Sequence, residues 1–418
     1  MENEFKDTEI GKIPVDWEVA TFSEIIDINP KRTLKKGEKY KKIAMTDIKE
    51  YTRKIQSYSD EEYKGGSRFT NEDTLFARIT PCLENGKTAF VDILNENEIA
   101  FGSTEFIVLC GKKGITDSKY VYYLSISPEI RKKTIKSMIG TSGRQRVPNE
   151  IFESIEIPLP PLEEQQKIAQ ILSALDDKIE NNNLQNKILE ETADSIFKEW
   201  FVNFNFLDEN GLQYFENGGE MEFNEELGIE IPKGWKVGKL GDLSNLMMGL
   251  SPKGESYNEN KEGIPLLNGA ADFNGKLINP TKYTTQPTRI CQKNDLIFCI
   301  RGTIGNITFA DLKYCLGRGV AALTPKKEIY KYIIYQNLEK SIENMTKQAA
   351  GSVIKGLSKN DISDLKITIA NDEIFLKYHK TVKEIFEKIS KNNSENQNLS
   401  NLRDLLLPKL MSGEIRLK

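Results

Sequence analysis

The chain has 418 residues, a formal net charge of −4, 38% apolar residues and 29% charged residues. This length exceeds one ordinary domain, and this composition is typical of a folded chain rather than an intrinsically disordered one. No apolar run approaches the roughly 20 residues of a membrane-spanning helix, and the polar N-terminus does not resemble a signal peptide, so we expect a cytoplasmic protein without a membrane partner.

The first half of the chain opens on Ile13-Pro14-Val15-Asp16-Trp17 and continues as a turn-rich segment with short β-type runs at 88–93 and 105–109. Lysine and arginine gather at 31–42 and 131–146, whereas acidic residues gather further along the chain. Such local patches attract a phosphate backbone even when the net charge is negative. One basic run by itself is also typical of a solubilising loop.

A long helix is predicted within residues 158–204. Pro158-Leu159-Pro160-Pro161 suits the approach to a helix, and Glu163 and Glu164 suit its first turn. Apolar side chains then recur at spacings of three and four residues. They are Ile168, Ile171, Leu172, Leu175, Ile179, Ile188, Leu189, Ile196 and Trp200. The stripe turns polar at Asn182-Asn183, which either fixes the register of a helix pair or interrupts the helix.

The second half repeats the first in the same order. Ile231-Pro232-Lys233-Gly234-Trp235 repeats the opening, and Asp295-Leu296-Ile297-Phe298-Cys299 repeats Asp73-Thr74-Leu75-Phe76-Ala77. A second helix is predicted from apolar positions at Val382, Ile385, Phe386, Ile389, Leu399, Leu402, Leu405 and Leu406. It has its own polar waist at Asn392-Asn393, and Pro408 is expected to bend or end it. The chain is therefore a tandem duplication with a domain-sized period.

These patterns predict an α+β fold. Two pseudo-repeated globular α/β domains are expected at 1–157 and 229–370, separated by helical spacers at 158–204 and 371–418 that pair as an antiparallel coiled coil. The polar, glycine-rich residues 205–228 are expected to be a linker.

Side chains that carry catalysis or bind metals are scarce. The five cysteines form no CxxC pair, and His379 stands alone in an apparent helix, so a disulfide framework, a zinc site and a histidine-based catalytic pair are not expected. The sequence also has no GxxxxGK[ST] phosphate loop. Asn29-Pro30 and Asn279-Pro280 lack the second proline and the aromatic residue of a methyltransferase motif. We therefore expect a non-catalytic chain.

The order of these segments resembles the specificity subunit of Type I restriction-modification systems over nearly the whole chain. The sharpest local matches are residues 75–87 and 157–165, together with the Ile-Pro-x-x-Trp openings at Ile13 and Ile231. The second half departs from the pattern where residues 300–306 replace the longer Arg-Ile-Thr-Pro loop.

The resemblance implies two target-recognition domains, each of which reads one half of a bipartite site on double-stranded DNA. It implies long helices that act as a spacer and bind two modification (methyltransferase) subunits, with restriction and translocase subunits joining through the complex. It implies no cofactor in this chain, because S-adenosylmethionine, ATP and magnesium would be bound by the partner subunits. The alternative is a non-catalytic scaffold whose globular domains bind proteins rather than DNA.

Candidate DNA-binding residues are those whose side chains suit base edges or phosphates. The first choice is the turn at 141–146, where small residues would admit the duplex, arginine suits guanine and Gln145 suits adenine; a simple surface turn is the alternative. Arg78 and Arg301 are placed at related strand-to-loop positions, where they would contact DNA or pair with an acid such as Glu105.

Phosphate contacts are expected from the basic run at 31–42. The full set of candidates is Lys31, Arg32, Lys41, Lys42, Arg78, Ser142, Arg144, Gln145, Arg146, Arg301, Arg318, Ser352 and Lys355. Trp17 and Trp235, which follow proline in both repeats, are expected in the core rather than in base stacking.

Overall fold

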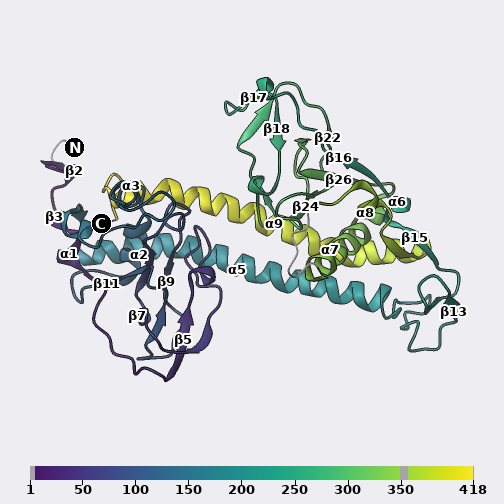
Figure 1. Ribbon diagram of the computed structural model, residues 1–418, viewed down its shortest axis with the longest axis horizontal. Helices are drawn as coiled ribbons and strands as arrows, with labels where there is room; N and C mark the ends of the chain where they lie inside the picture. The colour runs from purple at the N-terminus through teal and green to yellow at the C-terminus, as the bar shows by residue number, and fades with distance from the viewer. Residues whose placement is uncertain (1–4, 349–355, 418) are drawn as a thin grey trace. The chain divides into compact units, whose positions relative to one another are not determined.

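Two compact units make up the computed structural model, which describes residues 5–348 and 356–417. Unit 1 comprises Met1–Leu184 and Ser394–Lys418, and unit 2 comprises Gln185–Asn393 (Figure 1). Both units contain part of each of the two long helices, α5 (Leu162–Phe201) and α9 (Asp372–Met411). Each unit is therefore built from segments of both sequence repeats.

Unit 1 contains a mixed sheet, an antiparallel sheet and two strand pairs. The mixed sheet has the order β6 (Ser59–Glu62), β5 (Lys39–Ile43), β10 (Ala100–Gly102), β7 (Ser67–Phe69), with β5 and β10 parallel. The antiparallel sheet has the order β4 (Ile26–Ile28), β11 (Phe106–Gly111), β8 (Thr74–Ala77), β9 (Thr88–Phe90). The strand pairs are β1 (Phe5–Thr8) with β2 (Gly11–Pro14), and β3 (Glu18–Thr21) with β12 (Glu156–Leu159). The shorter helices are α1 (Phe22–Ile25), η1 (Met45–Asp47), α2 (Ser118–Ile126), α3 (Pro128–Lys136) and α4 (Ile151–Ser154).

Unit 2 repeats these sheets and adds strand β17 (Tyr257–Asn258) at the edge of the mixed sheet and one further strand pair. Its mixed sheet runs β17 (Tyr257–Asn258), β21 (Lys282–Thr284), β18 (Ile264–Leu267), β25 (Tyr314–Leu316), β22 (Ile290–Cys291), with β18 and β25 parallel. Its antiparallel sheet runs β16 (Ser244–Met248), β26 (Val320–Pro325), β23 (Leu296–Cys299), β24 (Ile307–Phe309). The strand pairs are β13 (Met221–Asn224) with β14 (Ile229–Pro232), β15 (Lys236–Lys239) with β27 (Lys366–Ile369), and β19 (Phe273–Asn274) with β20 (Leu277–Ile278). The shorter helices are α6 (Leu240–Leu243), η2 (Gly254–Ser256), η3 (Ala270–Asp272), η4 (Glu328–Tyr330), α7 (Lys331–Gln348) and α8 (Lys359–Ser363).

The two units thus share one topology. The central pair β8 and β11 of unit 1 corresponds to β23 and β26 of unit 2, because each pair is antiparallel and holds the same place in its sheet. The α+β fold and the duplication predicted from the sequence are confirmed.

The central strands are buried on both faces. In β8, Leu75 belongs to one hydrophobic cluster and Phe76 to another, so alternate side chains fill two cores on opposite faces of the sheet. In β23, Ile297 and Phe298 divide in the same way. A strand covered on both faces reads as a continuous apolar run instead of an alternating one, which is why these segments look alike in the sequence.

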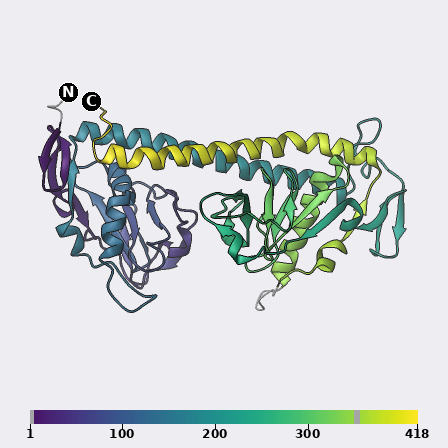
Figure 2. The ribbon, with the colours of Figure 1, turned by 90° about the horizontal axis from the view of Figure 1, so that it is seen from above.

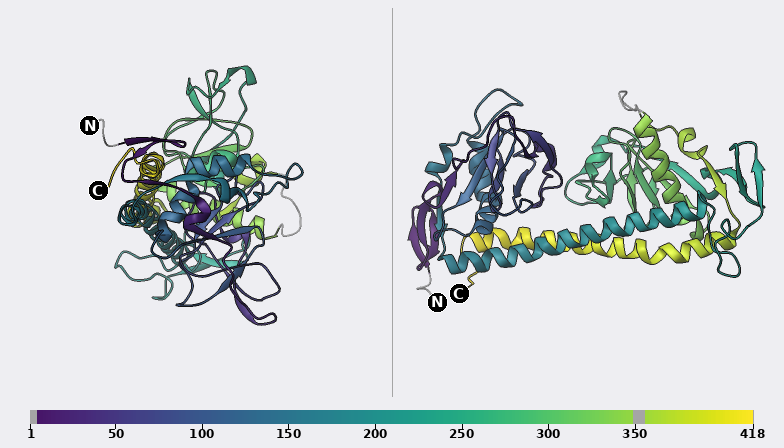
Figure 3. Two further views of the ribbon diagram at one scale, coloured as in Figure 1. Left: turned by 90° about the vertical axis from the view of Figure 1, so that its left-hand side faces the viewer. Right: turned by 90° about the horizontal axis from the view of Figure 1, so that it is seen from below.

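Both long helices extend without interruption through their polar waists. In unit 1, the first part of α5 lies beside the last part of α9 (Figure 2), and in unit 2 the last part of α5 lies beside the first part of α9 (Figure 3, right). The helices pair antiparallel in each unit. The antiparallel spacer is confirmed and the alternative of an interrupted helix is wrong. Pro408 does not end α9, because it lies in the last turn, where the missing N–H removes only one helical hydrogen bond.

Buried asparagines make a polar layer between the helices of unit 1. Asn182 donates through Nδ2 to Asn396 Oδ1 at 2.9 Å, and Asn396 Nδ2 donates to Asn183 Oδ1 at 2.9 Å. Asn182 is fully buried. A displaced register would leave these amides without partners, so the layer specifies how the two helices align.

Unit 2 has the same layer built from the other members of the repeat. Asn392 Nδ2 donates to Asn186 Oδ1 at 2.9 Å, and Asn186 Nδ2 donates to Asn393 Oδ1 at 2.8 Å. Asn392 is fully buried, like its counterpart in the first repeat. The polar waists are therefore register-setting contacts in both units.

A buried ion pair joins the two helices of unit 1. Arg403 NH1 lies 2.7 Å from Asp176 Oδ1, and the two side chains are 10% and 4% exposed. Tyr123 donates its hydroxyl to Asp176 Oδ2 at 2.7 Å, so the carboxylate also binds helix α2. Arg53, from the segment between β5 and β6, also binds α5: it donates to Glu180 through Nε and NH2 at 3.1 and 3.0 Å.

Loss of the Arg403 guanidinium should destabilise unit 1 strongly. We expect Arg403→Ala to lower the free energy of unfolding by about 3–5 kcal/mol, because it leaves the Asp176 charge buried without its partner. The measurement is chemical denaturation followed by far-UV circular dichroism. The control is Lys167→Ala, which removes an exposed pair with Glu163 and should cost less than about 1 kcal/mol. Equal losses in the two variants would contradict the assignment.

The C-terminal segment is fastened to the first residues of unit 1. Glu164 accepts hydrogen bonds from Trp17 Nε1 at 2.8 Å, from Arg416 Nε at 2.9 Å and from the Leu417 N–H at 3.0 Å. Gly413 has a φ of +75°, and a Cβ there would lie 2.4 Å from Pro14, so only glycine allows the chain to turn so closely against this surface. Trp17 and Trp235 are 0% and 7% exposed, which confirms that they are core residues.

This cluster should respond to acid. Burial raises the pKa of the Glu164 carboxyl, but the hydrogen bonds from Arg416, Leu417 and Trp17 outweigh burial and hold the pKa below its ordinary 4.5. A carboxyl whose pKa is lower in the folded state stabilises the fold above its unfolded pKa and loses that contribution as the pH falls through the folded pKa.

We therefore expect Glu164→Gln to be less stable than the wild type at pH 7, with the difference in unfolding midpoint disappearing as the pH falls below 4.5. Thermal unfolding between pH 3 and pH 7 measures this difference. Glu163→Gln, at the neighbouring exposed position, serves as the control and should track the wild type throughout. A Glu164→Gln deficit that did not change with pH would contradict the prediction.

Residues 205–228, which the sequence predicted as a linker, contain ordered structure. Phe206 stacks on Tyr214 at 4.6 Å and on Trp235 at 5.2 Å between ring centroids. Strand β13, which lies within this segment, pairs with β14, which follows it. The few aromatic side chains among many polar residues anchor it to the core of unit 2.

Candidate nucleic-acid interface

Three segments of unit 1 meet beyond the end of β8, and we call this meeting point junction 1. The Arg78 N–H donates to the Glu105 carbonyl at 3.0 Å, and the Val147 N–H donates to the Arg78 carbonyl at 2.8 Å. The Thr80 N–H donates to the Gln145 carbonyl at 3.0 Å. The end of β8, the start of β11 and the loop at 139–147 are therefore tied together through their backbones.

The loop at 139–147 is a small hairpin. Ile139 and Arg146 exchange backbone hydrogen bonds of 3.0 and 2.8 Å, and Gly140 and Gly143 adopt φ angles of +128° and +78°. The tip, which includes Ser142 and Arg144, is exposed. The turn predicted at 141–146 thus presents its side chains to solvent on a fixed base.

The two arginines of junction 1 differ in their environments. Arg146 forms an ion pair with Glu105, with NH2 2.7 Å from Oε1. Arg78 donates through NH2 to the Val147 carbonyl at 2.6 Å, and its buried Nε has no hydrogen-bond partner within residues 5–348 and 356–417. Glu105, the acid suggested as a partner for Arg78, is therefore bound by Arg146. Arg78 instead stabilises the loop through its hydrogen bond to Val147.

Unit 2 has an equivalent meeting point, junction 2. The Ile300 N–H donates to the Gly319 carbonyl at 2.9 Å, and the Leu357 N–H donates to the Ile300 carbonyl at 2.9 Å. These bonds reproduce the backbone pattern of junction 1. Ser352 and Lys355, the candidates from the matching loop, lie outside the described residues.

The backbone pattern gives the exact relation between two candidate arginines. Ile300 takes the position of Arg78, so Arg301 corresponds to Ile79, one residue further along, in agreement with the repeat of Asp73–Ala77 at Asp295–Cys299. Because side chains alternate along a strand, this shift sends them in different directions. Ile300 is 2% exposed, whereas Arg301 is exposed. Arg318 is also exposed, next to the glycine that bonds Ile300.

The basic run at 31–42 is largely neutralised by nearby carboxylates. Strand β5 pairs with the acidic strand β6, and Lys42 lies 2.8 Å from Glu61. Lys41 lies 2.9 Å from Glu98, and this hydrogen bond raises the pKa of the Lys41 amine. These carboxylates come from other parts of the sequence and neutralise charge within the run. The attraction of the run for phosphate is therefore weaker than its lysine and arginine content indicates.

Two further candidates of this run differ from each other. Arg32 bonds the buried Asp73 at 2.9 Å and the Arg68 carbonyl at 3.2 Å, which gives it a structural role and argues against DNA contact. Lys31 is exposed and keeps its place among the candidates.

Comparison with known proteins decides the family. The family described as "Type I restriction modification DNA specificity domain" matches residues 14–191 and 232–402, one copy in each sequence repeat. This chain belongs to that family. It is a specificity subunit, the non-catalytic recognition subunit of a Type I restriction-modification system.

Individual relatives agree over most or all of the chain. The chain is 30% identical to the Type I restriction enzyme MjaIX specificity subunit of Methanocaldococcus jannaschii, covering 100% of this chain and 98% of the relative. It is 27% identical to the HindI specificity subunit of Haemophilus influenzae, covering 82% and 86%. The crystal structure of the S subunit from M. genitalium, at 20% identity, shares the fold with a TM-score of 0.56 over 98% of this chain and 99% of that one.

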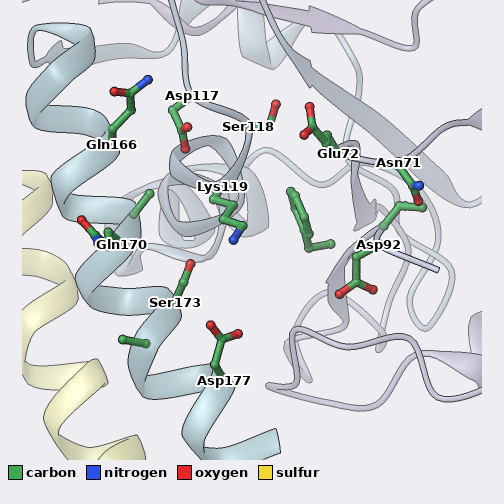
Figure 4. Close-up of a pocket in the computed structure, with 14 residues that line it drawn as sticks. Asn71, Glu72, Asp92, Asp117, Ser118, Lys119, Gln166, Gln170, Ser173 and Asp177 are labelled. Carbon is green, nitrogen blue, oxygen red and sulfur yellow. The ribbon is translucent and has the colours of Figure 1, made fainter. Parts of the chain in front are cut away.

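The specificity subunit also has a polar hollow of about 770 Å³ on unit 1, between α5 and the start of α2 (Figure 4). Gln166, Gln170, Ser173 and Asp177 line it from α5, and Asp117 and Lys119 line it from the start of α2. Glu72 and Asp92 add two more carboxylates. The excess of carboxylates over the single lysine makes this hollow unfavourable for a phosphate backbone.

His379 is buried in unit 2 against the ring of Tyr332, at 4.9 Å between centroids. Burial lowers the pKa of its imidazole. All five cysteines are free thiols. Among the helices of the described residues, none combines the length and apolar character needed to cross a membrane.

The different roles of Arg78 and Arg301 can be tested by the same substitution. We expect Arg78→Ala to lower the free energy of unfolding by about 1 kcal/mol, because the Val147 carbonyl loses its donor. Arg301→Ala should change it by no more than about 0.5 kcal/mol, because the side chain is exposed. Denaturant titration of both variants measures this. Equal stability losses would contradict the different roles assigned to the two arginines.

Proposed function

We propose that this specificity subunit reads a bipartite site on double-stranded DNA, one half with residues 1–157 and the other with residues 229–370. The observation that carries the proposal is that the two units build the same junction from backbone hydrogen bonds but equip it with different side chains. A common backbone frame that carries different side chains suits one protein that reads two different sequences. Base edges are distinguished by side-chain donors and acceptors, whereas the backbone only positions them.

The readers in unit 1 lie on the loop at 139–147: the exposed Ser142, Arg144 and Arg146 and the half-buried Gln145. The readers in unit 2 are Arg301 and Arg318, which lie just after β23 and just before β26 in junction 2. Arginine in such positions suits guanine, because its fork matches the N7 and O6 acceptors. Lys31 contributes to the phosphate contacts.

The long helices bind two modification subunits, through which restriction and translocase subunits join the complex. In unit 1, Leu184, Leu402 and Leu405 are 58%, 43% and 60% exposed on α5 and α9, so these apolar side chains are available to a partner subunit. In unit 2, Ile188 is 54% exposed on α5. The partner subunits supply the chemistry and bind S-adenosylmethionine, ATP and magnesium.

The proposal is tested by mapping methylated bases in the genome of a host that expresses this chain with its modification subunits. We expect Arg144→Ala combined with Arg146→Ala to relax one half of the site and Arg301→Ala combined with Arg318→Ala to relax the other. Each lost bidentate contact should reduce base discrimination by about 1–3 kcal/mol.

Exchange of residues 1–157 for those of a relative with a different site is the companion experiment. It should replace one half of the recognised sequence and leave the other unchanged. If the exchange changes that half but the loop variants do not, the readers lie elsewhere in the domain. If neither experiment alters the methylated sequence, the proposed function is wrong and the globular domains do not read DNA.

A further inference from the structure

The ion pair of junction 1 leaves one edge of an arginine open. Arg146 donates through Nε to both carboxylate oxygens of Glu105, at 3.0 and 2.9 Å, and through NH2 to Oε1 at 2.7 Å. Within the part of the chain that the structure describes, its NH1 group has one partner, the Arg144 carbonyl at 3.4 Å. The carboxylate thus occupies the Nε side of the guanidinium, while the NH1–NH2 edge remains available to a ligand.

The pair is not needed to hold junction 1 together. The Arg146 side chain is 44% exposed, and an ion pair in such contact with water adds little to stability. The two segments are already joined by the backbone hydrogen bonds of Glu105 and Val147 to Arg78, which lies between them. The backbone frame of junction 1 therefore does not explain why Glu105 and Arg146 are charged.

Unit 2 supports this separation of frame and pair. The backbone bonds of Ile300 place Gly319 at the position of Glu105 and Gly356 at the position of Arg146. Both side chains of the pair are replaced by glycine together, yet junction 2 forms with the same backbone bonds. The Glu105–Arg146 pair is therefore one of the features that distinguish junction 1 from junction 2.

We propose that Glu105 is a positioning residue that aims the NH1–NH2 edge of Arg146 at one guanine of the half-site read by unit 1, and that keeps this arginine away from phosphates. The inference rests on the proposed function. A guanidinium held by a carboxylate on its Nε side presents two parallel donors, which match the O6 and N7 acceptors of guanine. The same carboxylate repels a phosphate, so Arg146 contributes selectivity instead of general affinity for DNA.

The test uses the complex of the full chain with its modification subunits. Competition binding is measured against duplexes that carry the mapped site, the same site with each base pair changed in turn, and an unrelated sequence, at several salt concentrations. The variants are Glu105→Gln and Arg146→Ala. The control is Glu129→Gln, which removes an exposed carboxylate paired with Lys133 at 2.7 Å and changes the net charge equally.

We expect Glu105→Gln to reduce discrimination at one guanine position by roughly tenfold, because the arginine loses its fixed direction. It should also strengthen binding to unrelated DNA and steepen the dependence of log K on log salt by about one, because Arg146 becomes free to contact a phosphate. Arg146→Ala should reduce discrimination at the same position without steepening the salt dependence. Glu129→Gln should do neither, and the thermal midpoints of all three variants should match that of the wild type.

Two outcomes would overturn the inference. One is a Glu105→Gln complex with unchanged base discrimination and salt dependence. The other is a loss of discrimination at several positions together with a lowered thermal midpoint, which would show that the pair supports the fold. In both cases the proposed function stands if Arg144→Ala with Arg146→Ala still alters one half-site, so the two failures are distinguishable.

Discussion

In each unit, backbone hydrogen bonds join the residue that follows a buried central strand to two other segments of the junction. Arg78 in unit 1 and Ile300 in unit 2 each donate to the residue just before the neighbouring strand, β11 or β26, and accept from Val147 or Leu357. These bonds do not depend on side-chain identity, so a charged residue and an aliphatic residue fill the same position. The constraint falls on the strand, whose side chains must fill two cores, and the loop is free to vary.

The same separation extends to how the helices are held. Both units use buried asparagines to set helix register, and neutral amides carry a smaller desolvation cost than charges. Beyond this layer the units differ. The buried carboxylate of Asp176, which binds Tyr123 in unit 1, corresponds in the repeat to Phe386, which packs on Tyr335 in unit 2 at 5.1 Å. Unit 1 thus places a buried charge where unit 2 places an aromatic ring.

Much of this architecture was predictable from the sequence, because its causes are local or periodic. The spacing of apolar residues predicted α5, the repeated motifs predicted the second unit, and the small residues of 141–146 predicted a turn. The candidate site was harder to predict from the sequence. The carboxylates that neutralise Lys41 and Lys42 come from other strands, and only the pairing of β5 with β6 brings one of them close. Arg78 and Arg301 lie one residue apart in the repeat, and the composition of the two segments does not show that this offset reverses the direction of a side chain on a strand.

The division of the two long helices has a consequence for biosynthesis. Unit 2 is formed by the continuous stretch Gln185–Asn393, whereas unit 1 needs Ser394–Lys418 to bury the inner faces of its first segment. On the ribosome, the part of the chain that is made first therefore waits for the part that is made last. At roughly 5–20 residues per second the delay is on the order of ten to forty seconds, during which the part of α5 in unit 1 lacks its neighbour α9. The domain that begins second in the sequence is the first that can be complete, and the nascent first domain is the stretch that chaperones would have to shield.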